Sequence, residues 1–406
     1  MTSPDTSRPV LLLGGGASTL AAARSLGSAG IPVYVSGRAG CRALRSRHCR
    51  LALPVPVGME APQFWENILI STPDPKLAGC VIMVGCDESL QFVETHESAL
   101  REHYVVEEFL PDLRRAMLDK RDTLTLARQA GVPTPNFWAV DAAEDVFAIR
   151  DELRFPVMVK PLNSLTFMEE FGRKLFIVRE DFDEVVDKVR LCRERGHKVM
   201  VVEMIPGPDS LLSSYYTYRT TGGALLYDYT KSVIRRWPVN RGGACFHQSE
   251  WLPETAEMGR RMFDGIGWQG IGNVEFKRDT RDGQLKIIEV NGRLTAGHPL
   301  VTRGGAPLDV IIYCHLTGQA LPRFDSYSQT LRLWDPMRDF MAFLQLRRAG
   351  ELGFRGWLRS IFAQKIILPF FCFDDPRPGL AEFSGLLGKL VRAPLAMRQR
   401  AGQNAD

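Results

Sequence analysis

The segment NVEFKRDTRDGQLKIIEVNGR, residues 273–293, constrains the fold of this chain more than any other stretch. Two runs of strand-forming residues flank an Arg-Asp-Gly sequence, which predicts an antiparallel hairpin. Residues two apart lie on one face of a strand, so Glu289 and Asn291 share a face, and Glu275 on the paired strand can point to it as well. Because polar groups in an otherwise apolar strand need partners, the hairpin predicts a polar site on a sheet.

The polar residues of this hairpin are of the types that bind magnesium. Two carboxylates and an amide carbonyl form an all-oxygen site of the kind that Mg²⁺ occupies together with phosphate oxygens. Arg293 lies two residues beyond Asn291 and adds a cation beside the same phosphates. The alternative is an exposed hairpin whose charged residues point to solvent, and the apolar residues of IIEVN argue against it.

The chain of 406 residues is long enough for two or three domains, each with its own core. Between residues 10 and 104, strand-like and helix-like segments alternate with short glycine-containing turns, which favours a parallel sheet with helical crossovers and so an α/β fold. A second unit begins near residue 111, and the pattern becomes helical after residue 326. We therefore expect domains at residues 1–110, 111–325 and 326–406.

The composition argues against several classes of protein. Hydrophobic residues make up 45% and charged residues 24% of the chain, and no apolar run reaches the length of about 18 residues expected of a transmembrane segment. The first residues lack the features of a secretory signal, so we expect a cytoplasmic protein. A net charge of +4 does not indicate a nucleic-acid partner. The eight cysteines include no Cys-x-x-Cys pair, which favours reduced thiols over a zinc site.

The opening segment VLLLGGGASTLAAARSLGSAGIPVYVSGR resembles a nucleotide-binding turn only in part. A dinucleotide fingerprint requires three spaced glycines and an acidic residue near the end of the second strand. Here Gly14 and Gly16 are present, but Thr19 occupies the third position, and the second strand ends at Ser36 and Arg38. Arg38 can in principle face a 2′-phosphate, yet the simpler interpretation is a tight turn that requires glycine.

Two lysines and one strand end point to a nucleotide. Lys120 lies at an expected helix start in LDKRDT, and Lys160 ends the apolar strand FPVMVKP, where it either reaches water or meets a buried anion. Together with an acidic metal hairpin, two such lysines suggest neutralisation of a triphosphate. In VVEMIPGPD, the strand ends at Glu203, and Asp209 follows six residues later. Such a linker can offer its backbone to a purine and a carboxylate to ribose hydroxyls; an ordinary strand and turn is the alternative.

These motifs, in this order along the chain, resemble those of the ATP-grasp superfamily. DK…GVPTP, FPVMVKP, VVEMIPGPD and NVEF…IIEVNGR cover about residues 117–293 and are most similar to the carboxylate-amine ligases related to carbamoyl phosphate synthetase large-subunit domains. The fourteen positions from Glu275 to Glu289, and the two from Glu289 to Asn291, match the magnesium motif of that family. The resemblance implies an ATP-grasp fold with an N-terminal parallel-sheet pre-ATP-grasp domain and a helical C-terminal extension.

The resemblance also implies a role for each candidate residue. The residues implied to bind ATP are Lys120 and Lys160 at the phosphates, Glu203, Met204 and Ile205 at the adenine, Asp209 at the ribose, and Lys231 on a basic strand that faces the phosphates. The residues implied to bind Mg²⁺, or Mn²⁺ in its place, are Glu275, Glu289 and Asn291. The residues implied to be catalytic are Lys160, Arg235 and Arg293, of which Arg293 steadies the transferred phosphoryl group.

The activity implied is that of an ATP-dependent carboxylate-amine ligase. A substrate carboxylate takes the γ-phosphoryl group, and an amine captures the acyl phosphate to form an amide or peptide bond, with release of ADP and phosphate. Cations must neutralise the repulsion between a carboxylate and a triphosphate. The partners implied are a small carboxylate and an amine, and a homo-oligomer is compatible with the sequence. Arg303 can clamp a substrate carboxylate, although a surface arginine is the simpler interpretation, and His298 is more readily structural.

The chain departs from the family pattern in three places. The loop NSLTFMEEFGRK after Lys160 lacks the small residues that often cover the triphosphate, which leaves Lys174 as a contact and the lid geometry open. NGR stands where many relatives have Asn-Pro-Arg. The third departure is the segment after residue 326, which matches no catalytic core. The missing third glycine, by contrast, agrees with the family, in which the N-terminal glycine turn does not usually hold the nucleotide.

Two other functions remain open on the sequence alone. One is a phosphotransferase on the same scaffold, in which a hydroxyl takes the phosphoryl group and no amine is needed. The other is a nucleotide-responsive interaction protein whose C-terminal segments, GWLRSIFAQKIILPFFCF and LLGKLVRAPLAMRQR, mix apolar and basic residues. Such segments can contact a membrane surface or a second subunit, and packing against the core is the simpler alternative.

Overall fold

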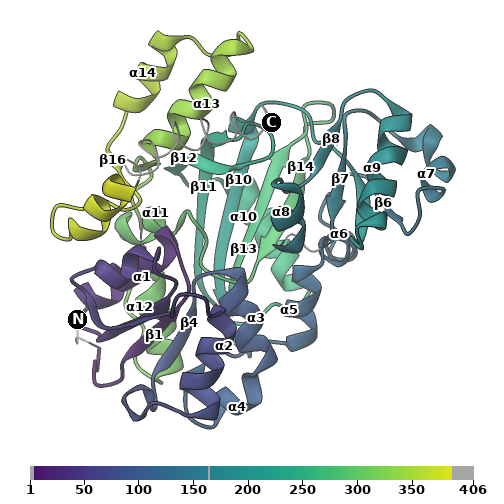
Figure 1. Ribbon diagram of the computed structural model, residues 1–406. Helices are drawn as coiled ribbons and strands as arrows, with labels where there is room; N and C mark the ends of the chain where they lie inside the picture. Colours follow the sequence, from purple (N-terminus) through teal and green to yellow (C-terminus); the bar gives the residue numbers. More distant parts are fainter. Residues whose placement is uncertain (1–3, 163–164, 325, 386–406) are drawn as a thin grey trace, which may run out of the picture. The chain divides into compact units, whose positions relative to one another are not determined.

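The computed structural model describes residues 4–162, 165–324 and 326–385 (Figure 1). Contacts divide the described residues into two units. The first comprises parts of residues 1–107, 294–325 and 366–406, and the second comprises parts of residues 108–293 and 326–365. None of the described helices has the length and the apolar character needed to cross a membrane.

The first unit contains a parallel sheet with the strand order β3-β2-β1-β4-β5. The strands of this sheet are β1 (Val10–Leu13), β2 (Val33–Gly37), β3 (Cys49–Pro54), β4 (Val81–Val84) and β5 (Val105–Val106). The short strand β16 (Ile366–Ile367) is not part of the parallel sheet. The helices of the first unit are α1 (Ala17–Ser28), α2 (Ala61–Glu66), α3 (Asp87–Thr95), α4 (Glu97–Arg101), α11 (His298–Arg303) and α12 (Leu308–Leu316). Every residue of the central strand β1 is buried, as expected of a parallel sheet covered on both faces. The predicted N-terminal parallel sheet is confirmed.

The second unit begins with two helices and a small antiparallel sheet with the strand order β6-β9-β7-β8. The helices are α5 (Pro111–Leu118), α6 (Lys120–Gln129), α7 (Asp145–Ala148), α8 (Leu165–Phe171) and α9 (Phe182–Glu194). The strands are β6 (Phe137–Val140), β7 (Val157–Pro161), β8 (Phe176–Val178) and β9 (Val199–Glu203). Helix α9 packs on this sheet through Val185, Val186, Val189 and Cys192, whose spacing forms one apolar helical face.

A larger antiparallel sheet completes the second unit, with neighbouring strands in the order β14-β13-β10-β11-β12-β15. These strands are β10 (Leu212–Arg219), β11 (Leu225–Trp237), β12 (Gly243–Ser249), β13 (Gly270–Arg278), β14 (Leu285–Asn291) and β15 (Arg332–Trp334). The helices of this part are α10 (Pro253–Gly265), α13 (Pro336–Arg348) and α14 (Phe354–Phe362). Met200 and Val202 of the small sheet share one hydrophobic core with Val274, Phe276 and Ile287 of the large sheet. The core therefore joins the two sheets of this unit.

Contacts assign two segments differently from the expected domain boundaries. Residues 294–325 group with the first unit because helices α11 and α12 pack against α1. Residues 326–365 group with the second unit because β15 pairs with β12 and α13 packs on β11. The first boundary, between residues 107 and 108, lies close to the expected one. The basic and apolar segment from residue 386 onward lies outside the described residues.

A buried carboxylate fixes the first part of the C-terminal extension to the sheet. Asp339 of α13 is fully buried and accepts hydrogen bonds from the guanidinium of Arg235 on β11, at 2.6 and 3.1 Å. The indole N–H groups of Trp334 and Trp357 donate to the same carboxylate, at 3.0 and 2.8 Å. A buried charge is stable only with such a complete set of partners. The buried pair thus fixes α13 to strand β11 within the second unit.

The N-terminal glycine turn has a steric reason. Gly14 has a φ of 78° and Gly15 a φ of 123°, both in the region that favours glycine. A Cβ atom at Gly14 would lie 2.3 Å from the Sγ atom of Cys86. Arg38 is engaged by carboxylates, with 2.7 Å to both Glu60 and Glu88. The backbone conformation of Gly14 and Gly15, and the approach of Cys86 to Gly14, thus give these two glycines a steric role in the turn.

We predict that Gly14→Ala destabilises the protein by about 2 kcal/mol, because the new methyl group meets Cys86 in a strained backbone conformation. Gly16→Ala is the matched control, since a Cβ atom there has no neighbour within 4 Å. We expect it to cost less than about 1 kcal/mol. Urea unfolding of both variants measures the difference, and equal destabilisation would contradict the steric explanation.

Candidate active site

The register of the β13–β14 hairpin brings the candidate metal ligands together. Glu275 lies opposite Glu289, and Asn273 lies opposite Asn291. Burial, and then the neighbouring Glu289 carboxylate, raise the pKa of Glu275. The expected hairpin and its shared polar face are therefore present, whereas the metal-binding role of these residues stays a prediction.

The donor set fits a divalent cation. Two facing carboxylates, one with a raised pKa, indicate negative charge that the described side chains compensate incompletely. The amide nitrogen of Asn291 lies 3.4 Å from Glu289 Oε1 and from Asn273 Oδ1, a long distance for a hydrogen bond. Within the described part of the chain, no group of three or more His, Cys, Asp or Glu residues is placed to hold a metal. The remaining oxygen ligands would have to come from the amide, water or a phosphate.

Two residues on this face escaped the sequence analysis. Asn273 is fully buried and donates to the carbonyl of Tyr215 at 3.1 Å. Its position two residues before Glu275 is a signal that the alternation of the strand could have given. Ser214 on β10 lies opposite both Glu275 and Lys231, and its buried hydroxyl has no hydrogen-bond partner among the described residues. Ser214 is therefore another polar group available to a ligand.

Three lysines from different elements lie in the electrostatic neighbourhood of these carboxylates. Burial, and then the Lys160 ammonium, lower the pKa of Lys120 at the start of α6 to about 8, against the effect of Glu289. Burial lowers the pKa of Lys160 on β7, and Glu289 again opposes the shift. Lys231 on β11 is 1% exposed, and burial lowers its pKa against Glu275 and Glu289. The structure thus brings these lysines and glutamates together.

Arg235 points to Asp339 instead of to this cluster, and its neighbour Arg236 takes the place expected for it. The pairing of β11 with β12 shifts register on both sides of Arg235. Such a bulge changes which residues share a face. The Arg236 guanidinium acts electrostatically on Glu275 and Lys160, and its Nε donates to Asp209 at 2.7 Å. Strict alternation from Lys231 leads to Arg235, so the sequence could not reveal the exchange.

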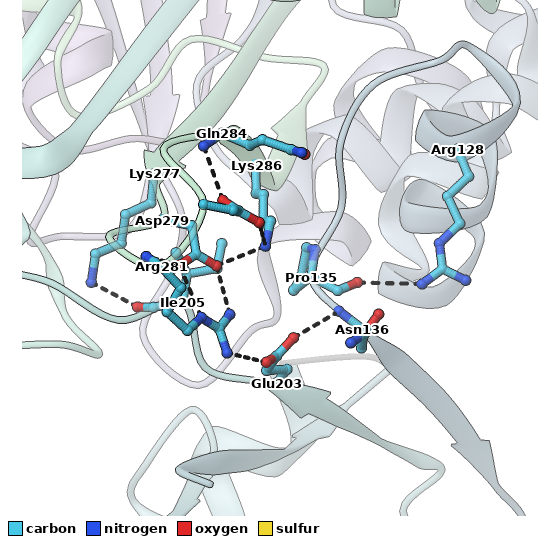
Figure 2. Close-up of polar contacts among 11 residues, drawn as sticks. Arg128, Pro135, Asn136, Glu203, Ile205, Lys277, Asp279, Arg281, Gln284 and Lys286 are labelled. Atoms are coloured by element: carbon cyan, nitrogen blue, oxygen red, sulfur yellow. Dashed lines mark hydrogen bonds and ion pairs between the residues drawn. The ribbon is translucent and has the colours of Figure 1, made fainter. Parts of the chain in front are cut away.

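The strand end implied to contact adenine is held by backbone bonds. The Glu203 amide donates to the Asn136 carbonyl at 2.8 Å, and the Met204 amide donates to the Pro156 carbonyl at 3.1 Å. The Glu203 carboxylate is 3% exposed and is paired with Arg281 (Figure 2). Because the Glu203 side chain is already engaged, any contact of Glu203 with a base would come from its backbone.

Asp209, implied at the ribose, is also engaged by protein groups. One of its oxygens accepts from Arg236, and the other accepts from the Asn240 amide at 2.9 Å. It lines a cavity of about 360 Å³ in the second unit. The other lining residues that carry polar side chains are Ser210, Arg235, Arg236, Asn240 and Glu351. A ribose contact would require Asp209 to share or exchange its present partners.

The turn of the hairpin carries a charged network that the sequence analysis missed (Figure 2). Asp279 is fully buried and accepts from Arg281, at 2.6 and 2.9 Å, and from Lys286, at 2.7 Å. The Arg281 guanidinium beside it, and then Lys286, hold the pKa of Asp279 well below its usual range. Lys277 donates to the carbonyls of Ile205 and Gly207. The sequence signal was the density of charge in KRDTRDGQLK.

Comparison with known proteins identifies the architecture. No family model matches the chain. The D-aspartate ligase of Enterococcus faecium is 24% identical over 249 residues, 56% of this chain and 56% of that protein. The carbamoyl phosphate synthase large chain, N-terminal section, of Methanopyrus kandleri is 21% identical over 364 residues, 83% of this chain and 62% of that protein. The chain thus spans less than two thirds of the length of either relative.

A solved structure has a similar fold. The biotin carboxylase domain of Hydrogenobacter thermophilus 2-oxoglutarate carboxylase, in complex with MgADP and bicarbonate, aligns with a TM-score of 0.60 at 17% identity. The alignment covers 79% of this chain and 73% of that chain. The chain has the ATP-grasp fold. The fold and the resemblance predicted from the motifs are confirmed.

The remaining candidates lie elsewhere in this ATP-grasp chain. Arg293 is partly exposed and follows β14. Arg303 is exposed and donates to the Sγ atom of Cys372 at 3.0 Å. His298 and Asp309 are both fully buried and lie 2.6 Å apart, which agrees with a structural histidine. Of the loop after Lys160, residues 163–164 lie outside the described part, and Lys174 is exposed.

We predict that Asp279→Asn lowers the free energy of unfolding by about 3 kcal/mol near neutral pH, because Arg281 and Lys286 lose their common counter-ion. The pKa of Asp279 is lower in the folded protein than its ordinary value of 3.8. Its contribution is therefore present above about pH 4 and is lost as the pH falls toward the folded-state pKa. The difference between variant and wild type should shrink below about pH 4.

The control for this pH dependence is Asp282→Asn in the same turn. Asp282 is 38% exposed, pairs with Lys286 and accepts from the Gln284 backbone amide at 2.9 Å. Because this pair is exposed, we expect a loss of less than about 1 kcal/mol. Urea unfolding between about pH 3 and pH 7 measures both variants. If the free energy of unfolding of Asp279→Asn differed from that of the wild type by the same amount at every pH in this range, the explanation would be wrong.

Proposed function

We propose that this protein is an ATP- and Mg²⁺-dependent ligase that joins a small carboxylate to an amine, with Mn²⁺ as an alternative ion. The observation that carries the proposal is the cluster of Lys120, Lys160 and Lys231 around Glu275 and Glu289. Lysines with lowered pKa and a carboxylate with raised pKa share this site. A bound polyanion would compensate the positive charge of the lysines, and a bound divalent cation would compensate the negative charge of the glutamates.

The reaction needs charge neutralisation more than a side-chain nucleophile. A substrate carboxylate oxygen forms a bond to the γ-phosphorus, and the bond between that phosphorus and the β,γ-bridging oxygen of ATP breaks to release ADP. The amine then attacks the acyl carbon, phosphate leaves, and the amine gives up a proton. In this proposal Lys120, Lys160 and Lys231 hold phosphate oxygens during these steps. Bound Mg²⁺ would neutralise phosphate charge beside Glu275 and Glu289.

Relatives support the class of reaction and suggest a substrate class. One of the two relatives named above is a D-aspartate ligase, and this chain covers 56% of that protein. We therefore propose an amino acid or a similar small carboxylate or amine as one substrate. Arg236 is our proposed contact for the transferred phosphoryl group or substrate carboxylate, in place of Arg235, and Arg293 remains a proposed second cation.

The first test measures release of ADP and phosphate by the purified protein with ATP and Mg²⁺. We expect release to require both a pool of carboxylates and a pool of amines, because the acyl phosphate forms on one and is captured by the other. Glu289→Gln should abolish the release, while Glu257→Gln, on the exposed face of α10, should leave it unchanged. Release with a hydroxyl acceptor and no amine would favour a phosphotransferase instead.

The second test separates the two adjacent arginines. We expect Arg236→Gln to lower the turnover number about 100-fold, because a cation is lost beside Glu275. It should lower the melting temperature less than Arg235→Gln does, because Asp209 loses one donor but keeps the Asn240 amide and is less buried than Asp339. Arg235→Gln should instead lower the melting temperature, because it leaves Asp339 buried with one partner fewer. Kinetics and thermal unfolding of both variants are the measurements. The opposite pattern would restore Arg235 as the catalytic residue.

A further inference from the structure

The strand end that would meet the base is tied to the turn of the β13–β14 hairpin. Lys277 is 2% exposed, and its ammonium donates to the carbonyls of Ile205 at 3.0 Å and of Gly207 at 2.6 Å. Arg281 forms an ion pair with the buried Glu203 carboxylate. Both ends of the segment 203–207, here named the hinge segment, are therefore held by side chains of the hairpin. Figure 2 shows the contacts of Arg281 with Glu203 and of Lys277 with Ile205.

The arginine of this contact is itself held in place. The guanidinium of Arg281 donates from Nε and Nη2 to the Asp279 carboxylate, and its Nη1 is left for Glu203. Lys286 donates to the same Asp279 carboxylate. The turn is closed by the backbone bonds from Gly283 to Asp279 and from Asp279 to Gln284, at 2.8 and 2.9 Å. A planar guanidinium fixed on one edge presents its other edge in one direction.

This pairing leaves a specific pair of backbone groups on the hinge segment. The Met204 amide is used by Pro156, and the Ile205 carbonyl is used by Lys277. The Met204 carbonyl and the Ile205 amide have no hydrogen-bond partner among the described residues. One acceptor next to one donor matches the edge of adenine that carries the N6 donor and the N7 acceptor, whereas the same edge of guanine carries two acceptors, O6 and N7.

The same hairpin carries the proposed metal ligands. Glu275 precedes Asp279 by four residues on the chain, which corresponds to roughly 13 Å along an extended strand. An extended nucleoside triphosphate spans a similar length from its base to its last phosphate. One rigid element therefore reaches both ends of the nucleotide.

We propose that Arg281 and Lys277 are positioning residues for the nucleotide base, which hold the hinge segment at a fixed place relative to Glu275 and Glu289. The inference rests on the proposed ATP-dependent function. Without Arg281, the hinge segment is no longer held at a fixed position relative to the hairpin. The base then loses its contacts with the backbone of the hinge segment, while the phosphates keep their contacts. Arg281 thus sets the affinity for the base and the preference for adenine.

The test is isothermal titration of the full chain with three probes in the presence of Mg²⁺: ATP, GTP and inorganic tripolyphosphate. We expect Arg281→Gln to weaken ATP binding about tenfold or more, which is the effect of losing one charge-assisted hydrogen bond. The ratio of ATP to GTP affinity should fall with it. Tripolyphosphate, which has no base, should bind wild type and variant equally. Equal weakening of tripolyphosphate would overturn the inference, because it would mean a general disturbance.

Two further variants make the result specific. Arg261→Gln is the control, since Arg261 lies on α10, is 48% exposed and pairs with the exposed Glu257; it should bind all probes as the wild type does. Arg281→Lys should retain part of the affinity, because it keeps the charge but not the fork. In the double variant Glu203→Gln with Arg281→Gln, ATP binding should stay weak. Full recovery there would show that Arg281 only neutralises Glu203 and would overturn the positioning role.

The outcomes for inference and function are distinguishable. Wild-type protein that binds neither ATP nor tripolyphosphate would contradict the proposed function itself. Wild type that binds ATP, together with Arg281→Gln that binds it equally well, would overturn the positioning role and leave the proposed function intact.

Discussion

The facing carboxylates of Glu275 and Glu289 are the constraint on which the second unit depends. The register of two strands fixes them opposite each other, and burial disfavours the charge of Glu275. Lys120, Lys160 and Lys231 come from a helix and two other strands and reach the same place, each desolvated in turn. The glutamates and the lysines do not fully compensate each other's charge, since the pKa of Glu275 is raised while the pKa values of the lysines are lowered. The fold therefore maintains a region of charge that a bound polyanion and cation can complete.

The features that the sequence predicted are those that local rules determine. The Arg-Asp-Gly turn and the alternation of the flanking strands were sufficient to pair Glu275 with Glu289, because turn chemistry and a period of two act over a few residues. The parallel sheet of the first unit followed from alternating strand and helix signals in the same way. The confirmed ATP-grasp fold followed from the order and spacing of several such motifs.

The features that the sequence could not give depend on contacts between distant residues. At the register shift around Arg235, the guanidinium of this residue bonds to Asp339, which lies more than a hundred positions later in the chain. The pairing of Arg281 with Glu203 spans 78 positions, and nothing local distinguishes Arg281 from an exposed turn residue. Residues 294–325 looked continuous with the preceding domain, yet α11 and α12 pack against α1 near the start of the chain.

The two ends of one hairpin show how charge compensation separates structure from binding. Asp279 at the turn has donors from Arg281 and Lys286, and its pKa is lowered, so its charge is fully used in holding the turn. Glu275, four residues away on the same strand, has a raised pKa and lies opposite a like charge. A satisfied carboxylate stabilises the fold, whereas an unsatisfied one is tolerated only because the rest of the structure over-determines its position. The turn thus fixes the strands of the hairpin in the register that keeps Glu275 and Glu289 opposite each other.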